Sequence, residues 1–317
     1  MYAGISPFEP VPASTARVAA DAPARQRSRG EVRVAFAADG EGGTDGGVNG
    51  NDGDDGEGGG WGDGRAPTRL ARLYHAGAAR ALFPRPLRPG RPEAVLLNTA
   101  GGLTGGDRMA IDVTWGAQSA AAVTTQAAEK IYRAGDGDAR IDTRLTVGDG
   151  ARADWLPQET ILFDNARLSR TTTIDAAPGA RVLAAEALVL GRAAMGETIT
   201  ATAVSDRWRV SRGGRLVFAD ALRLDRDLAR ALAGGACLAG HRALATVLYL
   251  APDAEARLDG ARDALGANGE AGTAGASAWD GLLVARLLAP DGLTLRRRLA
   301  TLLAWLSDSP LPRIWWT

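Results

Sequence analysis

The chain has few of the side chains that build tight metal sites or disulfides. It contains one cysteine, Cys237, and two histidines, His75 and His241, so an intrachain disulfide and a cluster of cysteines or histidines around a metal are both excluded. Neither histidine stands in the sequence context of a nucleophile elbow or a zinc-protease helix. We therefore expect no catalytic residues and no tightly bound cofactor, and we interpret both histidines as structural or surface residues.

An excess of charge and a long apolar run are also missing. The 317 residues carry 37 basic and 37 acidic side chains, and no basic stripe stands out, so we expect no nucleic-acid partner. No run of about 18 apolar residues is present, so we expect no membrane partner and a cytoplasmic location. The 45% hydrophobic content is ample for a core. We expect a flexible tail at residues 1–30 and a single β-rich domain at 31–317.

Residues 39–64 form a tract of glycine and acidic side chains. Half of them are glycine, eight are acidic and none is basic, so the tract cannot bury enough apolar surface to offset its ordering entropy. We predict a disordered insertion in a loop between strands at 31–36 and 68–77. A calcium-binding glycine–aspartate array is a minor alternative, because only Val48 and Trp61 could supply the large apolar residues that such repeats stack.

Short segments of alternating apolar and polar residues dominate the chain after residue 65. In residues 109–115 the side chains of Met109, Ile111, Val113 and Trp115 share one face, which is typical of a half-buried strand. The same pattern predicts strands at residues 140–147, 170–175, 206–210, 215–220 and 281–289.

Three glycine turns lead into similar segments that begin at residues 116, 150 and 179. A spacing near thirty residues indicates stacked strand–turn–strand units. Helices are predicted at residues 253–267 and 292–306, the second with one stripe of leucines. Its members are Leu295, Leu299, Leu302, Leu303 and Leu306. We therefore expect a mainly β fold, a β-superhelix or solenoid-like body of many short strands with about two C-terminal α-helices.

A glycine-rich loop lies at residues 98–108 and contains Gly101, Gly102, Gly105 and Gly106. Gly101 and Gly106 have the spacing of a phosphate-binding loop, but Asp107 stands at the lysine position and a strand is predicted to follow in place of a helix. A carboxylate there would repel phosphate. We therefore exclude nucleotide binding and interpret the loop as a tight turn with several positive φ angles. Its length leaves room for close approach by a partner.

Single charged residues give weaker indications. Lys130, the one lysine, is interpreted as a chance survivor in an arginine-rich chain, with a buried amine of shifted pKa as the alternative. Acidic side chains are usually solvated. Five of them, predicted at strand ends or beside turns, would make an oxygen-rich path for a divalent cation if they pointed inward. They are Asp107, Asp154, Glu159, Glu186 and Glu197.

Five ordered motifs resemble those of the UreD family of urease accessory proteins, also called UreH. They are NTAGGLTGGDR at 98–108, TTQAAEKIYR at 124–133, WLPQETILF at 155–163, GRAAMGE at 191–197 and LPRIWWT at 311–317. The resemblance runs from about residue 31 to the C-terminus. The chain departs from the family pattern in its acidic insertion, in Gln126 where proline is frequent, and in Glu129 where a small residue is usual.

The resemblance implies a non-enzymatic scaffold that binds a UreF-like protein and, through it, a UreG-like GTPase, and that docks them on apo-urease. Nickel would pass through an internal tunnel, and weak oxygen ligands suit such transient nickel binding because a conduit must release its cargo. The five carboxylates are the proposed route. The proposed motif and interface residues are Gly101, Gly102, Gly105, Gly106, Lys130, Tyr132 and Arg192.

Two other readings remain open from the residues alone. A β-solenoid enzyme would use paired carboxylates in a groove as general acid and base. A calcium-dependent binding module would rest on the acidic insertion.

Overall fold

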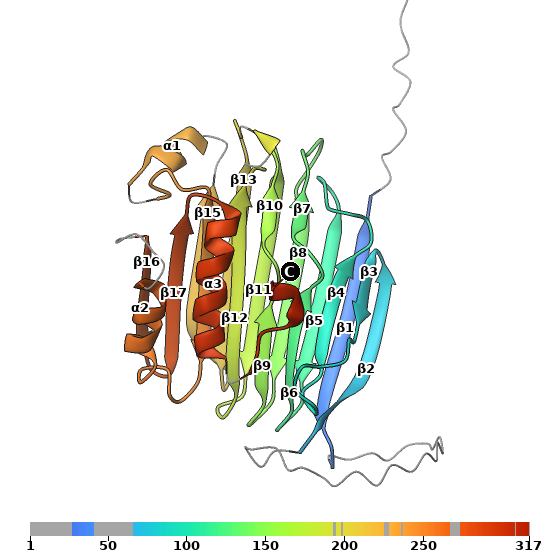
Figure 1. The fold of residues 1–317 in the computed structure, drawn as a ribbon. Helices are drawn as coiled ribbons and strands as arrows, with labels where there is room; N and C mark the ends of the chain where they lie inside the picture. The colour runs from blue at the N-terminus through green and yellow to red at the C-terminus, as the bar shows by residue number, and fades with distance from the viewer. Residues whose placement is uncertain are drawn as a thin grey trace, which may run out of the picture.

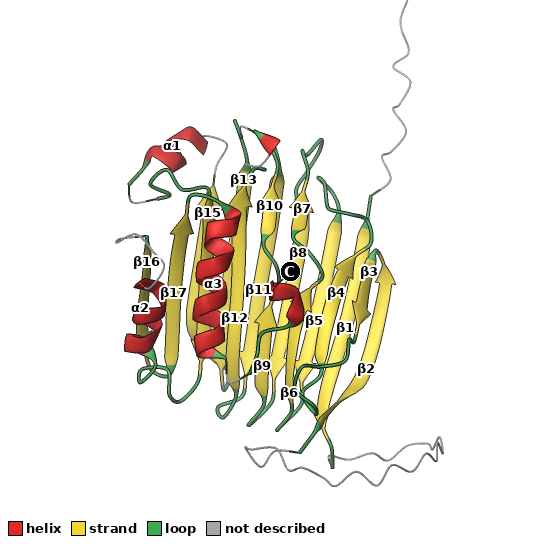
Figure 2. Ribbon diagram, viewed as in Figure 1, coloured by secondary structure: helices red, strands yellow, loops and turns green. Residues whose placement is uncertain are grey.

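The computed structural model of the protein describes residues 27–40, 66–192, 195–197, 199–224, 228–235, 237–266, 273–307 and 309–316. These residues form two stacked β-sheets, with helices on the outer face of one of them (Figures 1 and 2). The seven-strand sheet contains, in spatial order, β14 (Arg215–Leu224), β13 (Ala203–Arg212), β11 (Arg167–Ala176), β8 (Ala139–Val147), β5 (Arg108–Trp115), β1 (Arg29–Ala38) and β2 (Thr68–Gly77).

The ten-strand sheet contains β16 (Ala274–Trp279), β17 (Leu282–Ala289), β15 (Ala243–Leu250), β12 (Arg181–Leu190), β9 (Arg152–Leu156), β6 (Ala120–Thr125), β4 (Glu93–Asn98) and β3 (Ala79–Leu82). Two short strands, β10 (Thr160–Leu162) and β7 (Glu129–Ile131), extend it beside β12.

The centre of each sheet is parallel, because the chain winds from one sheet to the other in a solenoid of about four turns. The glycine turns at residues 116, 150 and 179 lead into β6, β9 and β12, which are neighbours in the ten-strand sheet. Antiparallel strands close the stack at both ends. The mainly β, solenoid-like prediction is confirmed.

The strand positions follow from the alternating pattern. In β5 the side chains of Met109, Ile111, Val113 and Trp115 are buried, as predicted, and β8 alternates between buried and exposed residues over its whole length. The strands predicted at 31–36, 68–77, 140–147, 170–175, 206–210, 215–220 and 281–289 are present as β1, β2, β8, β11, β13, β14 and β17.

The helices are α1 (Leu228–Ala233), α2 (Leu258–Gly266), α3 (Gly292–Leu306) and the 3₁₀ helix η2 (Arg313–Trp316). Helix α3 has the predicted bounds, a buried leucine stripe and an Asp291 cap that accepts a hydrogen bond from the Thr294 N–H at 2.8 Å. Helix α2 begins five residues later than predicted, and the short α1 was not predicted. No helix among the described residues is long and apolar enough to cross a membrane.

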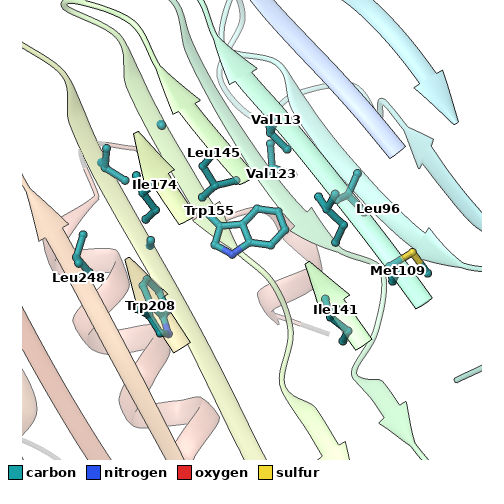
Figure 3. Close-up of a cluster of buried hydrophobic side chains, with 14 of the residues drawn as sticks. Leu96, Met109, Val113, Val123, Ile141, Leu145, Trp155, Ile174, Trp208 and Leu248 are labelled. Carbon is teal, nitrogen blue, oxygen red and sulfur yellow. The ribbon is translucent and has the colours of Figure 1, made fainter. Parts of the chain in front are cut away.

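Two apolar layers hold the structure together. One lies between the sheets and includes Trp155, Leu145 and Ile174 (Figure 3). The other lies between the ten-strand sheet and helices α2 and α3. The ten-strand sheet is therefore covered on both faces, whereas the outer face of the seven-strand sheet carries mostly polar side chains.

The acidic insertion belongs to the connection between β1 and β2. Ala38 and Thr68 are register partners, and the Asp39 N–H donates to the Pro67 carbonyl at 2.7 Å, so the two ends of the connection lie side by side. Residues 41–65 and 1–26 lie outside the described residues, and so do the predictions of disorder or calcium binding in the insertion and of a flexible tail. Strand β1 begins at Arg29, two residues before the predicted domain boundary.

Candidate functional site

A cavity of about 660 Å³ lies between the sheets, near the edge where β14 ends the seven-strand sheet. Strands β11, β13 and β14 form one wall, and β12, β15, β16 and β17 form the other. Cys237 and Leu238, which follow α1, also contribute. Its lining includes eight polar or charged side chains: Arg170, Glu186, Asp206, Asp220, Arg223, Thr246, Thr273 and Arg286.

Two cross-strand rows bring these polar residues together. In the seven-strand sheet Arg170 of β11 is the register partner of Asp206 of β13. In the ten-strand sheet Glu186 of β12 pairs with Thr246 of β15, which pairs with Arg286 of β17. The rows meet across the interior, where the Arg170 Nε lies 3.1 Å from the Glu186 Oε2. A polar stripe thus crosses an otherwise apolar layer.

The inner end of the cavity is a buried charge cluster. Arg170, Glu186 and Asp206 are each at most 6% exposed. The guanidinium of Arg170 donates to both carboxylate oxygens of Asp206, at 3.0 Å and 2.6 Å, and to the Thr160 hydroxyl at 3.3 Å. The Thr172 hydroxyl donates to Glu186 at 2.7 Å. One cation therefore faces two carboxylates, and the cluster has one negative charge in excess when both are ionised.

Glu186 is the least satisfied member of this cluster. Burial raises its pKa to about 7; Arg170 and the Thr172 hydroxyl act to lower the pKa, and Asp206 acts to raise it. The Oε2 atom accepts no hydrogen bond from the part of the chain that the structure describes, and the Nε–H of Arg170 beside it is directed at Asp206. Near neutral pH this carboxylate can therefore take up a proton.

The outer end of the cavity is open to solvent. The Arg286 Nη2 lies 2.7 Å from the Asp220 Oδ2, and these side chains are 59% and 24% exposed, against 3% for the Glu186 side chain. Cys237 beside them is also exposed. The polar stripe thus leads from solvent to the buried cluster.

The five carboxylates predicted as a route occupy three separate places. Only Glu186 among them lines the cavity. Asp154 and Glu159 lie toward the helices: Asp154 contacts the Arg91 Nη2 at 2.5 Å, and Glu159 lies 3.4 Å from the Arg296 Nη1. The expectation that all five lie at strand ends or beside turns was wrong for Glu186 and Asp154, which stand inside β12 and β9.

Asp107 and Glu197 anchor loops at a third place. The carboxylate of Asp107 accepts hydrogen bonds from the Thr104 N–H at 2.8 Å and the Ser28 N–H at 2.7 Å, and β5 begins at the next residue. Partial burial acts to raise the pKa of Glu197, but hydrogen bonds from Arg192 and from the Asp164 N–H lower it overall. These two carboxylates fix backbone.

Most of the predicted interface residues form one surface, which we call the glycine-loop surface: Gly101, Gly102, Lys130, Tyr132, Phe163, Arg192 and Met195. The Tyr132 hydroxyl donates to the Gly101 carbonyl at 3.1 Å, and its ring meets Phe163 edge-on at 4.8 Å. The Arg192 guanidinium stacks on the other side of this group, 4.2 Å from the Phe163 centroid. Phe163 therefore contacts residues from two of the motifs, Tyr132 and Arg192, and the sequence analysis did not identify it as an interface residue.

The glycines of this loop behave largely as predicted. Gly101, Gly102 and Gly106 have positive φ angles of 75°, 144° and 89°. Gly105 has no positive φ and is restricted by packing instead, because a Cβ there would lie 2.7 Å from the Asp136 carbonyl oxygen. The side chain of Lys130 is exposed, so the buried-amine alternative was wrong.

Arg170 and Asp206 are the site residues that the sequence analysis missed. Both stand at buried positions of alternating strands, Arg170 between Leu168 and Thr172 in β11 and Asp206 before Trp208 in β13. A charged residue at a buried position of the pattern is the signal that could have identified them. In the described part of the chain, no three His, Cys, Asp or Glu side chains are grouped to hold a metal ion.

Comparison with known proteins gives one consistent result. A family model described as UreD urease accessory protein matches residues 61–316. "Urease accessory protein UreD 2" of Methylorubrum populi is 47% identical over 293 residues, which cover 92% of each chain. "Urease accessory protein UreD" of Methylobacterium sp. (strain 4-46) is 50% identical over 79% of this chain and 89% of its own. "Urease accessory protein UreD" of Azorhizobium caulinodans is 45% identical over 93% of this chain and 99% of its own.

Proposed function

This chain belongs to the UreD family of urease accessory proteins, and we propose that it acts in urease maturation as a scaffold without catalytic activity of its own. In this proposal it links a complex of UreF-like and UreG-like proteins to apo-urease. Nickel is the cargo, and it reaches the urease active site by way of the interior of the β-body.

The observation that carries the nickel proposal is the cluster of Arg170, Glu186 and Asp206 at the inner end of the cavity. It offers carboxylate oxygens with one negative charge in excess when both are ionised, and it is reached from solvent along a polar stripe. Oxygen ligands without histidine or cysteine hold Ni²⁺ weakly. Arg170 competes for the same oxygens, so a cation would bind here briefly and leave again.

The same geometry favours a conduit over an enzyme. Asp206 is held by both arms of the Arg170 fork, and Glu186 lies against the same guanidinium. In glycosidases, by contrast, the paired catalytic carboxylates stand apart, with the substrate between them. The names of the relatives also point to an accessory role. We therefore place the solenoid-enzyme reading behind the scaffold.

The glycine-loop surface is the proposed docking site for an accessory partner. Tyr132 is 38% exposed and Met195 is 73% exposed, while the ring contacts of Phe163 and the hydrogen bond of Tyr132 hold the surface rigid. Exposed aromatic and arginine side chains on a rigid frame are typical centres of protein interfaces. A rigid surface also loses little conformational entropy on binding.

The test is reconstitution of maturation in cells that express the urease structural subunits with UreF-like and UreG-like proteins, with and without this chain. We expect urease activity and nickel content to depend on the chain, and both partners to co-purify with it. A Tyr132→Ala variant should reduce co-purification, whereas Trp279→Ala, at an exposed aromatic residue of β16, should not. Fully nickel-loaded urease without the chain would contradict the proposal.

A further inference from the structure

The outer face of the seven-strand sheet is an arginine-rich surface. Every second residue of its strands points away from the core, and helices α2 and α3 lie on the far side of the other sheet (Figure 2). Six exposed arginines on this face form no ion pair with any described residue: Arg29, Arg72, Arg108, Arg144, Arg207 and Arg209. They come from five strands, so the sequence does not present them as a basic run.

One register row concentrates this charge. Arg29 of β1 faces Arg108 of β5, which faces Arg140 of β8, and the row continues with Ser169 of β11. Neighbouring strands lie about 4.8 Å apart. Like charges directly opposite each other destabilise a sheet. Among the described residues, the one ion pair of this row joins the Arg140 Nε to the Asp142 Oδ2 at 4.0 Å. The row is therefore a local cost to stability that an anionic partner would relieve.

We propose that this arginine face docks an acidic surface of a partner protein. A protein fits better than a nucleic acid, because Glu31, Asp112 and Asp142 stand among the arginines in the adjacent rows. A uniformly negative phosphate backbone would meet these carboxylates, whereas a protein surface can match them with its own cations. The proposal rests on the proposed function in one respect: it takes the partner to be one of the urease maturation proteins.

The first experiment does not depend on urease. Fluorescence anisotropy measures binding of labelled poly-L-glutamate to the full chain at low salt. The Arg29→Glu/Arg108→Glu/Arg140→Glu variant should lose at least about tenfold in affinity, because three attractive charges become repulsive. The control, Arg85→Glu/Arg297→Glu/Arg313→Glu, has the same net charge with exposed arginines off this face, and it should lose much less. Equal losses in the two variants would overturn the proposal.

Two other occupants are separated by the same assay. Labelled oligo-dT of 20 nucleotides tests a nucleic acid as the occupant. If it bound more tightly than poly-L-glutamate, and if only the Arg29→Glu/Arg108→Glu/Arg140→Glu variant lost oligo-dT binding, the face would be a nucleic-acid site. If deletion of residues 41–65 raised the affinity for poly-L-glutamate about tenfold, the acidic insertion of the chain itself would be the occupant. Either result would overturn the proposal of a protein partner.

The second experiment uses the co-expressed urease and accessory proteins. At 50 mM NaCl the first variant should retain less of the complex than the control does. The difference should shrink as NaCl is raised to 300 mM, because salt screens the charge contacts that only the control keeps. If the chain captured its partners and the two variants behaved alike, the arginine-face proposal would fail while the proposed function stood. If the chain captured no maturation protein, the proposed function would fail, and the poly-L-glutamate result would decide the proposal.

Discussion

The two faces of the ten-strand sheet each bury an arginine–carboxylate pair, and the two pairs differ in balance. On the face toward the other sheet, Glu186 shares Arg170 with Asp206, so two carboxylates meet one cation. On the face toward the helices, Asp154 lies 2.5 Å from Arg91, and Arg152 and Arg181 line the same small cavity. A balanced pair fastens structure, whereas an unbalanced one leaves charge for a proton or a cation.

The cavities beside the two pairs also differ: the cavity at Glu186 is much larger than the one at Asp154. The cavity beside Asp154 measures about 20 Å³, room for about one water, and its lining includes Leu306 and Ser307 at the end of α3. The cavity beside Glu186 measures about 660 Å³ and opens to solvent at Arg286. Of Asp154 and Glu186, only Glu186 shares its arginine with a second carboxylate and lines the larger cavity.

The largest effect is expected from removing each arginine. Arg170→Leu leaves two buried carboxylates without a countercharge, and we expect a loss of about 3–5 kcal/mol in the free energy of unfolding. Arg91→Leu removes one arginine from Asp154, which keeps the Ser307 hydroxyl and lies in a cavity also lined by Arg152 and Arg181, so it should cost less, roughly 2 kcal/mol. Urea denaturation at pH 7.5 measures both. A larger loss at Arg91 than at Arg170 would reverse the comparison.

The glycine-rich loop is restricted by close packing and not by buried charge, so substitutions there test a different source of stability. A Cβ at Gly102 would lie 2.4 Å from the Tyr132 ring and 2.8 Å from the Lys130 carbonyl, so Gly102→Val should cost about 2–3 kcal/mol and weaken partner binding. Gly105→Val should also destabilise, by contact with backbone. Gly101→Val is the control, since it shares a positive φ but has open space. If all three variants had the same thermal midpoint, the packing argument would be wrong.

The next effect is a pH dependence of opposite sign at two glutamates. The folded pKa of Glu186 is raised to about 7, so its contribution to stability is complete below pH 4.5 and is lost as the pH rises through 7. Glu186→Gln should therefore flatten the decline of stability between pH 5.5 and 8.5, by on the order of 2 kcal/mol. Glu197 has a lowered pKa, so its contribution is lost on acidification. Denaturation curves for Glu186→Gln and Glu197→Gln that changed with pH in the same sense would refute this assignment.

The smallest effect is expected from the acidic insertion. Its ends are held together by the pairing of Ala38 with Thr68, so deletion of residues 41–65 should shift the thermal midpoint by less than about 2 °C. Urease activation should stay nearly unchanged in cells that express the deletion variant with urease and the other accessory proteins. A folded deletion variant that failed to activate urease would assign the tract a role in maturation.

Much of the fold could be predicted from the sequence because the seven-strand sheet has one face in water. Its strands alternate, so β5 and β8 could be placed with their buried faces. The ten-strand sheet is covered on both faces, and β12 is buried at nine of its ten positions. Alternation then vanishes, and the sequence does not tell whether Glu186 or Asp154 faces the cavity.

The composition of the site was harder to predict than the fold. Arg170, Glu186 and Asp206 come from three strands and meet through register pairing and sheet stacking. Spacing along the chain carries no such information. The glycine-loop surface was easier, because its motifs had been grouped by family resemblance, and the structure adds Phe163 as their shared contact.

The most direct test of the central claim is the nickel content of urease purified from cells that carry Glu186→Gln or Glu159→Gln in this chain, at limiting nickel. Both changes remove one carboxylate and keep its shape, but only Glu186 lines the cavity. Pull-down of the partners and of apo-urease confirms assembly in each strain. We expect nickel content and activity to fall with Glu186→Gln and to stay near wild type with Glu159→Gln. Normal nickel content with Glu186→Gln, in a normally assembled complex, would contradict the claim.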